Sequence, residues 1–538
     1  MKYFSLGFLF FVQIFFSQNF SNVDTLKGSD TKFRNFWNVT KYELTVEPDF
    51  ENKTVSGSNV ISWEITKDIE NPTFQIDLQQ PMQFKMIGKE NWNIKRDGDF
   101  IFVYAKEKFK KGDKGLFSIK YSGNPTIANN APWDGGWVFE KDKNGNPWMS
   151  VAQEGIGVSV WLPTKDIWND EPENGIKMTI ISPKDLMGIG NGKLISNEIK
   201  NEKRISIWEV KNAINPYSIV PNIGKYVHFG EKHQGEKGNL DLDYWVLDYN
   251  LEKAKKQFAQ VKPMMKAFEY WFGPYPFYED SYKLVESPYL GMEHQSNVAY
   301  GNGFKNGYLG RDLSGTGVGL QWDFIIIHES GHEWFANNIT AKDQADMWIH
   351  ESFTCYSETL FTENYLDKNS ADTYLQGLRR NIQNDKPIIG KYGVRNEGSG
   401  DMYYKGANML HTIRQIINDD EKFREILRGL NMDFYHQTVT TKTIENYISI
   451  KSGIDFSTVF DQYLRTTKIP TLVYYQDGKT LNFKFENAVE NLNLPITIDE
   501  KTSIKPTKNW QTVTLSSQKP VVWDKNYYVT FFDIKNKF

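Results

Sequence analysis

The sequence predicts a multidomain α+β protein with a large antiparallel β domain, a mostly helical middle and a small β-sandwich at the end. Alternation of apolar and polar residues with a period of two, typical of strands that bury one face, continues to about Tyr226 and returns from Thr471. Between these segments apolar residues recur at helical spacing. The 538 residues are enough for several domains with full cores.

Residues 18–233 are predicted to form the N-terminal β domain. Its alternating runs include residues 42–46, 61–65 and 117–121. Turn pairs such as Asp97-Gly98 separate these runs. The high aromatic content, 15%, fits a strand-rich chain.

Residues 234–466 are predicted to be mostly helical, with a short sheet at the start. A helical pattern over residues 251–271 ends at Gly273-Pro274, and a strand follows at about 282–285. Later helices are expected at residues 347–364, 404–417, 421–430, 443–451 and 456–464.

Residues 467–538 are predicted to form the small β-sandwich. The runs on either side of Asp477-Gly478 indicate a hairpin. Residues 521–523 and 528–532 are expected to be further strands.

The N-terminus indicates a secretory signal at residues 1–17. A short basic start is followed by a nearly unbroken apolar run over residues 3–16, too short for a comfortable membrane span. We expect cleavage after Ser17 and an exported protein, periplasmic or secreted. An uncleaved membrane anchor is the alternative. No later run is long enough to span a bilayer, so we expect no stable membrane insertion after signal removal.

Composition excludes some classes of protein. The net charge is −4 and there is no sustained basic patch, so we expect no nucleic-acid partner. The single cysteine, Cys355, allows no intramolecular disulfide. We expect it to be a small packing residue.

A His-Glu-x-x-His motif at residues 328–332 supplies ligands and a base for one zinc ion. Residues four apart on a helix share a face, so His328 and His332 can point at one metal. Glu329 is offset and can reach a water, while Glu351 from a second helix completes the ligand set. Two imidazoles and one carboxylate leave the open position that hydrolysis needs. The alternative is a buried helix whose polar groups bond only to protein, which is costly without a charged partner.

Further motifs follow this one. An Asn-x-x-Thr pattern occurs around Asn337, Asn338 and Thr340, and Trp348-Ile349-His350-Glu351 resembles a family segment that ends in Asn-Glu, with His350 in place of the asparagine. Together the motifs resemble the aminopeptidase N / leukotriene A4 hydrolase family of zinc aminopeptidases, a gluzincin group. The resemblance covers nearly all of the mature chain. It implies one Zn²⁺ per chain, a β saddle domain, a thermolysin-like catalytic domain and a β-sandwich. We expect a short form without the helical C-terminal domain of many members.

A second signature concerns the substrate amine. Gly291, Met292, Glu293 and His294 are similar to the family's Gly-x-Met-Glu-Asn, with Gly291 shifted by one position and His294 replacing asparagine. The resemblance implies that Glu293 binds the free α-amine, with Gly291 and Met292 beside it. A carboxylate at a fixed distance from the zinc would restrict cleavage to the first residue. An ordinary strand-edge carboxylate is the alternative for Glu293.

A third signature, Tyr-x-Lys-Gly, starts at Tyr403. The resemblance implies that Tyr403, rather than Tyr404, donates a hydrogen bond to the oxyanion. A phenol is a suitable neutral donor for that role. A packing tyrosine is the alternative.

Two further carboxylates are candidates. Glu154, in a segment that resembles the family's second amine anchor, could equally be a structural loop residue. Glu358 lies seven residues after Glu351 on the same helix face and could orient a zinc histidine, or could belong to a solvated face.

These observations predict a zinc aminopeptidase that acts on peptides with a free N-terminus. A thermolysin-type endopeptidase and a non-catalytic peptide-binding protein are the alternatives. The preferred first side chain, the peptide length limits and the oligomeric state stay open.

Overall fold

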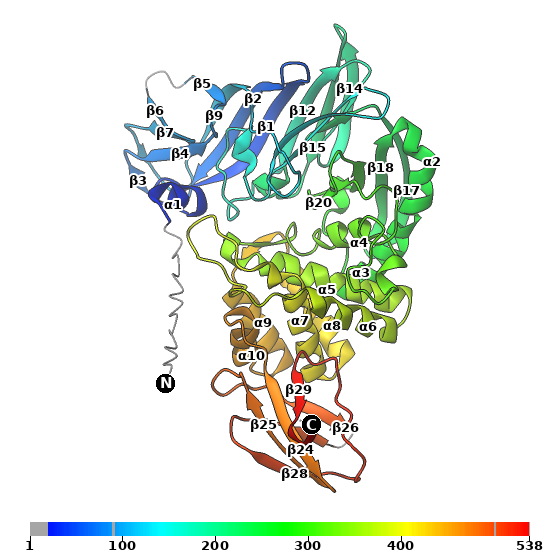
Figure 1. Cartoon of the computed structure of the whole chain (residues 1–538). Coiled ribbons are helices and arrows are strands. Elements are labelled where there is room, and N and C mark those ends of the chain that lie inside the picture. The colour runs from blue at the N-terminus through cyan, green and yellow to red at the C-terminus, as the bar shows by residue number, and fades with distance from the viewer. Residues whose placement is uncertain (1–19, 89–91, 500–501, 537–538) are drawn as a thin grey trace, which may run out of the picture.

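The computed structural model describes residues 20–88, 92–499 and 502–536. Figure 1 shows β-sheets at one end, a layer of helices in the middle and a small β unit at the other end. This arrangement confirms the predicted multidomain α+β fold. The predicted signal segment, residues 1–17, lies outside the described residues. Within the described part of the chain, no helix combines the length and the apolar character that crossing a bilayer requires.

A seven-stranded sheet forms the centre of the N-terminal part. Neighbouring strands are antiparallel except β1 and β12, which pair in parallel. The burial alternates along β1, as the period-two pattern predicts. In spatial order the strands are β14 (Lys193–Lys200), β15 (Lys203–Val210), β12 (Ile176–Pro183), β1 (Trp37–Asp49), β2 (Thr54–Ile65), β9 (Lys114–Gly123) and β5 (Gln83–Ile87).

Smaller sheets pack against this one and share its core, which contains Trp37, Trp63 and Trp208. A short helix, α1 (Asn22–Gly28), precedes them. The four-stranded sheet has the order β10 (Gly136–Lys141), β11 (Pro147–Ala152), β16 (Asn222–Gly224), β13 (Met187–Ile189). The others are β4 (Thr73–Asp77), β7 (Phe100–Tyr104), β6 (Asn93–Asp97) and the pair β3 (Ile69–Glu70), β8 (Lys108–Phe109).

A five-stranded sheet opens the middle part. Its order is β17 (Tyr226–Gly235), β18 (Gly238–Leu247), β19 (Tyr282–Glu286), β21 (Val298–Tyr300), β20 (Gly291–Met292). The predicted domain boundary at residue 233 falls inside β17, which pairs with β18 along its whole length. The domain limits themselves stay predictions.

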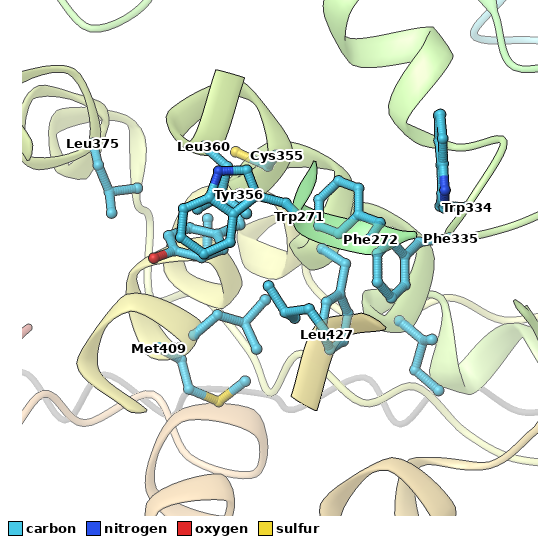
Figure 2. Close-up of a cluster of buried hydrophobic side chains, with 14 of the residues drawn as sticks. Trp271, Phe272, Trp334, Phe335, Cys355, Tyr356, Leu360, Leu375, Met409 and Leu427 are labelled. Carbon is cyan, nitrogen blue, oxygen red and sulfur yellow. The ribbon is translucent and has the colours of Figure 1, made fainter. Parts of the chain in front are cut away.

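The helices of the middle part surround α5, which is buried on all sides over most of its length. Apolar side chains from α3, α5, α6, α7 and α8 meet there in one core (Figure 2). The helices are α2 (Leu251–Gln257), α3 (Val261–Phe272), α4 (Phe324–Gly331), α5 (Trp348–Tyr365), α6 (Lys368–Leu378), α7 (Tyr404–Ile417), α8 (Asp420–Asp433), α9 (Thr441–Ser452) and α10 (Ser457–Leu464). Two short strands, β22 (Ile339–Ala341) and β23 (Gln437–Val439), pair in parallel beside them.

The predicted helices exist within a few residues at each end, but the one at residues 251–271 is divided into α2 and α3 by a 3₁₀ turn, Phe258–Gln260. The short helix α1 was not predicted, and neither was α6. Its buried residues Ala371, Tyr374, Leu375 and Leu378 follow the i, i+3, i+4, i+7 pattern. The side chain of Asp367 caps its first turn by accepting from Ser370 N. The signal was therefore present in the sequence.

The C-terminal part contains a four-stranded sheet in the order β28 (Gln511–Thr514), β25 (Thr480–Glu486), β24 (Thr471–Asp477), β29 (Thr530–Asp533). A second pair is β26 (Ile496–Asp499) and β27 (Thr502–Ile504). The hairpin predicted around Asp477-Gly478 is β24 and β25. The strand predicted at residues 521–523 is wrong. Trp523 instead stacks on Phe531 with ring centroids 5.0 Å apart, so ring packing replaces backbone pairing.

Candidate active site

The predicted metal ligands come together between α4 and α5. α4 ends at Gly331, and His332 follows with helical backbone angles, φ −64° and ψ −19°. Glu351, in the first turn of α5, places Oε2 at 3.6 Å from His328 Nε2 and 3.5 Å from His332 Nε2. One ligand atom from each of the three residues lies within 4.8 Å of the others.

These three residues fit a metal ion. Glu351 Oε2 is buried and has no hydrogen-bond partner, which is costly for a carboxylate unless a cation compensates it. The other ring nitrogens are engaged: His328 Nδ1 lies 2.7 Å from Glu358 Oε1, and His332 Nδ1 lies 3.1 Å from Phe335 O. Such contacts fix the rings and leave both Nε2 atoms available for a metal.

Glycines allow the helices to approach one another at this site. A Cβ on Gly331 would lie 2.5 Å from Ser357 Oγ on α5. A Cβ on Gly406 would lie 1.8 Å from Ser352 Oγ, which donates to Met402 O at 2.6 Å. Ser352 follows the ligand Glu351 directly, so the close contact of α7 with α5 sets where Tyr403 lies relative to the metal ligands.

Glu358 lies behind His328, and only 1% of its surface is exposed. Its second oxygen, Oε2, accepts a hydrogen bond of 2.5 Å from the hydroxyl of Tyr374 on α6. Tyr374 was not predicted as a site residue, because α6 was not predicted. A chain of contacts from Tyr374 through Glu358 to His328 thus orients the first imidazole.

Glu329 lies beside Gly291 at the edge strand β20. A Cβ on Gly291 would be 3.0 Å from Glu329 Oε1 and 2.8 Å from a methyl carbon of Ile325. Burial raises the pKa of Glu329 to about 7, although the charges of the two neighbouring histidines lower it. A carboxyl with such a pKa is suited to exchange a proton with a water near neutral pH.

Glu293 and Glu154 approach the same cavity from different domains. Glu293 follows β20, is 3% exposed, and its Oε1 has no hydrogen-bond partner. Asn337 Nδ2 donates to the Glu293 carbonyl at 2.7 Å, which gives the Asn-x-x-Thr pattern a structural role. Burial, and then the charge of Glu293, raises the pKa of Glu154, whose Oε1 is also without a partner.

The hydroxyl of Tyr217 belongs to this group as well. Burial, followed by the charges of Glu293 and Glu154, raises its pKa far above the usual value. Nothing in the local sequence marked Tyr217, which lies in a short 3₁₀ turn, Pro216–Ser218.

Tyr403 immediately precedes α7, and its ring centroid lies 6.0 Å from that of His328. Burial, and then the charge of Glu351, raises the pKa of Tyr403, so its phenol stays protonated and can donate. Tyr404 also lines the cavity. Lys405 turns away, donating to Thr466 O at 2.8 Å.

Both histidines that depart from the family pattern are buried. His350 Nε2 accepts from Ala341 N at 2.7 Å, and burial lowers the pKa of His350 to about 3. A neutral imidazole can therefore accept the bond that an amide oxygen could accept. Burial likewise lowers the pKa of His294 to about 3, but neither ring nitrogen has a hydrogen-bond partner.

The cavity at these residues has a volume of about 440 Å³. Both the N-terminal β part and the helical part line it. Six glutamates contribute to the described lining, which contains no lysine or arginine. They are Glu154, Glu293, Glu329, Glu351, Glu358 and Glu397. Cys355 also lines the cavity and is buried. Glu397 was not predicted as a site residue. Burial, and then the charge of Glu351, raises its pKa.

Comparison with known proteins agrees with this geometry. Residues 257–463 match the peptidase family M1 domain. The chain is 21% identical over 466 residues to Probable aminopeptidase 2 of Sulfurisphaera tokodaii, covering 83% of this chain and 56% of that protein. It is 23% identical over 293 residues to Leukotriene A-4 hydrolase of Xenopus laevis, covering 49% and 44%. The chain thus spans about half the length of these curated relatives.

Among solved structures, a mutant M1 zinc metallopeptidase from Deinococcus radiodurans, bound to a Tyr-Ser-Ala substrate, has a TM-score of 0.69 and 16% identity. The match covers 82% of this chain and 98% of that one, and shows a shared fold. The fold is therefore that of M1 zinc metallopeptidases, and the His-His-Glu cluster lies in the part of the chain that matches the M1 domain. The family M1 match over residues 257–463 and the similarity to aminopeptidases agree with the resemblance that the motifs predicted.

Proposed function

We propose that this protein is a zinc aminopeptidase that removes N-terminal residues from peptides. The observation that carries this proposal is the position of Glu293. Its buried, unpartnered carboxylate oxygen faces the same cavity as the three candidate metal ligands. An ammonium group is the natural partner for such an oxygen. A carboxylate that holds the substrate amine places the first peptide bond at the metal.

His328, His332 and Glu351 would hold the zinc. When bound there, zinc lowers the pKa of a water and polarises the scissile carbonyl. Glu329 accepts the proton of the attacking water and then passes it to the leaving amine. Tyr403 donates a hydrogen bond to the oxygen that becomes negative in the transition state.

Glu293 and Glu154 would determine where cleavage occurs. They hold the α-ammonium from the helical side and from the β side of the cavity. Trp133, which is 63% exposed, also lines the cavity from the β side. Proximity and orientation then favour the first bond over internal bonds.

A panel of aminoacyl-arylamides, measured with and without chelator and after zinc restoration, tests the proposal. We expect activity that chelation abolishes and zinc restores. Matched peptides with free and acetylated N-termini form the second arm, and only the free peptides should be cut. Equal cleavage of acetylated peptides would indicate an endopeptidase. A protein that binds no metal and cuts neither set would be a non-catalytic binding protein.

We also propose export of the protein, on the basis of the N-terminal sequence pattern alone. Cell fractionation with an antibody against the folded part tests this. Intact mass of the exported form shows whether cleavage follows Ser17. Recovery of the full-length chain in the membrane fraction would favour an anchor.

A further inference from the structure

A loop of the helical part reaches the N-terminal β part. It runs over residues 382–399, between two short 3₁₀ turns, Arg379–Asn381 and Gly400–Met402, and leads directly to Tyr403. Gly28 at the end of α1 packs on its backbone, because a Cβ there would lie 2.2 Å from Val394 C. In Figure 1 this yellow-green loop rises toward α1.

Arg395 makes the polar contacts between this loop and the β part. Its Nη1 donates to Ile156 O at 2.6 Å. Its Nη2 lies 3.4 Å from Asp166 O and 3.3 Å from Asp166 Oδ2. The side chain is 15% exposed and that of Asp166 is 3% exposed, so solvent screens this ion pair little.

Gly157 provides the space for the guanidinium group. A Cβ at this position would lie 2.4 Å from Arg395 Nη1 and 2.1 Å from Asp166 Oδ2. Asp166 is itself fixed, since Ser159 Oγ donates to it at 2.6 Å. The guanidinium therefore occupies a preformed, charged recess.

The carbonyl that Arg395 holds belongs to the turn that carries Glu154. Gly157 N donates to Gln153 O at 2.7 Å and closes this turn. At its start, Gln153 Nε2 donates to Tyr217 O and Ile219 O at 2.9 and 2.8 Å. At the other end, the Ile156 carbonyl accepts from two side chains, Arg395 Nη1 at 2.6 Å and Gln79 Nε2 of the β part at 2.7 Å. Glu154 has an unpartnered Oε1, so the backbone of the turn determines where its carboxylate lies.

We propose that Arg395 is a positioning residue that fixes the Glu154 turn from the opposite domain and so sets the affinity for a free N-terminus. This inference rests on the proposed aminopeptidase function. One side chain joins the turn with Glu154 to the loop that ends at Tyr403. The amine anchor and the oxyanion donor are thereby held at a constant separation across the domain boundary.

The test combines Arg395→Gln with Glu154→Gln. We expect Arg395→Gln to lower kcat/KM for an unblocked arylamide about 10-fold, chiefly through KM, with metal content unchanged. In the Glu154→Gln background, Arg395→Gln should lower kcat/KM by less than about 2-fold, because the two residues act as one unit. Arg395→Lys, which retains the charge, should recover part of the loss. Equal losses in both backgrounds would overturn the proposal.

A matched control is Arg96→Gln. Arg96 also donates to backbone carbonyls, those of Leu78, Met82 and Gly98, but within the β part. The Arg96→Gln variant should leave kcat/KM unchanged.

Amide hydrogen exchange tests the positioning role of Arg395 without any substrate. In Arg395→Gln the amides of residues 154–157 should exchange about 10-fold faster, since Ile156 O has lost one of its two side-chain donors and Gln79 alone remains. Unchanged exchange there would refute the role of Arg395, whatever the activity of the wild type. A wild type that cuts no unblocked peptide would instead refute the proposed function.

Discussion

At the scale of single residues, the site separates into groups that local spacing reveals and groups that only folding brings together. His328, Glu329 and His332 share one helical turn, so their chemistry was predictable from the sequence. The roles of Tyr374 and Tyr217 were not predictable, because each side chain reaches the site from a distant segment. The periodicity of α6 indicates that Tyr374 is buried, but not that its hydroxyl meets Glu358, and nothing near Tyr217 indicates its burial.

The carboxylate of Glu293 should contribute to catalysis and not to metal binding. Glu293→Ala removes a charge-assisted contact to the ammonium, worth about 1.5–3 kcal/mol. We expect kcat/KM on unblocked substrates to fall about 10- to 100-fold. Elemental analysis should show unchanged zinc. Full activity on unblocked substrates in this variant would exclude Glu293 as the amine anchor.

The contact between Glu358 and His328 should control metal affinity. Glu358→Gln weakens the acceptor that fixes the imidazole, and loss of such partners typically costs about 10- to 100-fold in affinity. Competition with a chromogenic chelator measures this. Tyr374→Phe, which removes only the donor to Glu358 Oε2, should show a smaller effect in the same direction. An unchanged affinity in both variants would contradict this role.

At the scale of elements, long periodic segments were predictable and short irregular ones were not. α7 was predicted with its exact limits, because its apolar residues recur at helical spacing. The segment 521–523 has the β-branched and aromatic residues of a strand. It pairs with no strand, since Trp523 packs on Phe531 and Tyr474 instead. Composition alone cannot distinguish ring packing from backbone pairing.

The close approach of α7 to α5 should depend on Gly406. Gly406→Ala would place a methyl group 1.8 Å from Ser352 Oγ and 2.6 Å from its Cβ, so α7 must move. Overpacking of this kind costs about 1–3 kcal/mol. We expect a lower melting temperature and a lower kcat, since Tyr403 moves with α7.

Gly429→Ala on α8 is the matched control for this helix contact. The new methyl group would meet only the hydroxyl end of the Tyr447 side chain, at 2.3 Å, and that side chain can move. Alanine also favours the helix by up to about 1 kcal/mol. The melting temperature of Gly429→Ala should equal or exceed that of the wild type. Equal effects of both variants would contradict a special role for the α5–α7 contact.

At the scale of the whole molecule, the cavity exists only because two domains meet. The order of β, helical and β parts followed from the change in periodicity along the chain. The junction between the parts could not be predicted from periodicity, because it is built from buried polar contacts. One example is Glu171 in the β part, whose Oε1 accepts from Thr340 Oγ1 of the helical part at 2.6 Å.

This junction should make stability depend on pH. Burial raises the pKa of Glu171 to about 7 from 4.5, although hydrogen bonds from Thr340 and Asn215 lower it. The folded state therefore favours the protonated acid. Its contribution to stability is complete below about pH 4.5 and is lost as the pH rises through about 7, at most about 3 kcal/mol.

Glu171→Gln should remove this dependence and retain the contacts. The amide oxygen can still accept from Thr340 and Asn215, and it carries no charge at any pH. We expect similar melting temperatures for variant and wild type at pH 4.5, and a more stable variant at pH 8. The difference between the two proteins, measured by thermal unfolding across this range, should grow most between pH 5 and 7. A difference that stays constant with pH would mean that Glu171 is ionised in the folded junction, and that its charge is compensated there.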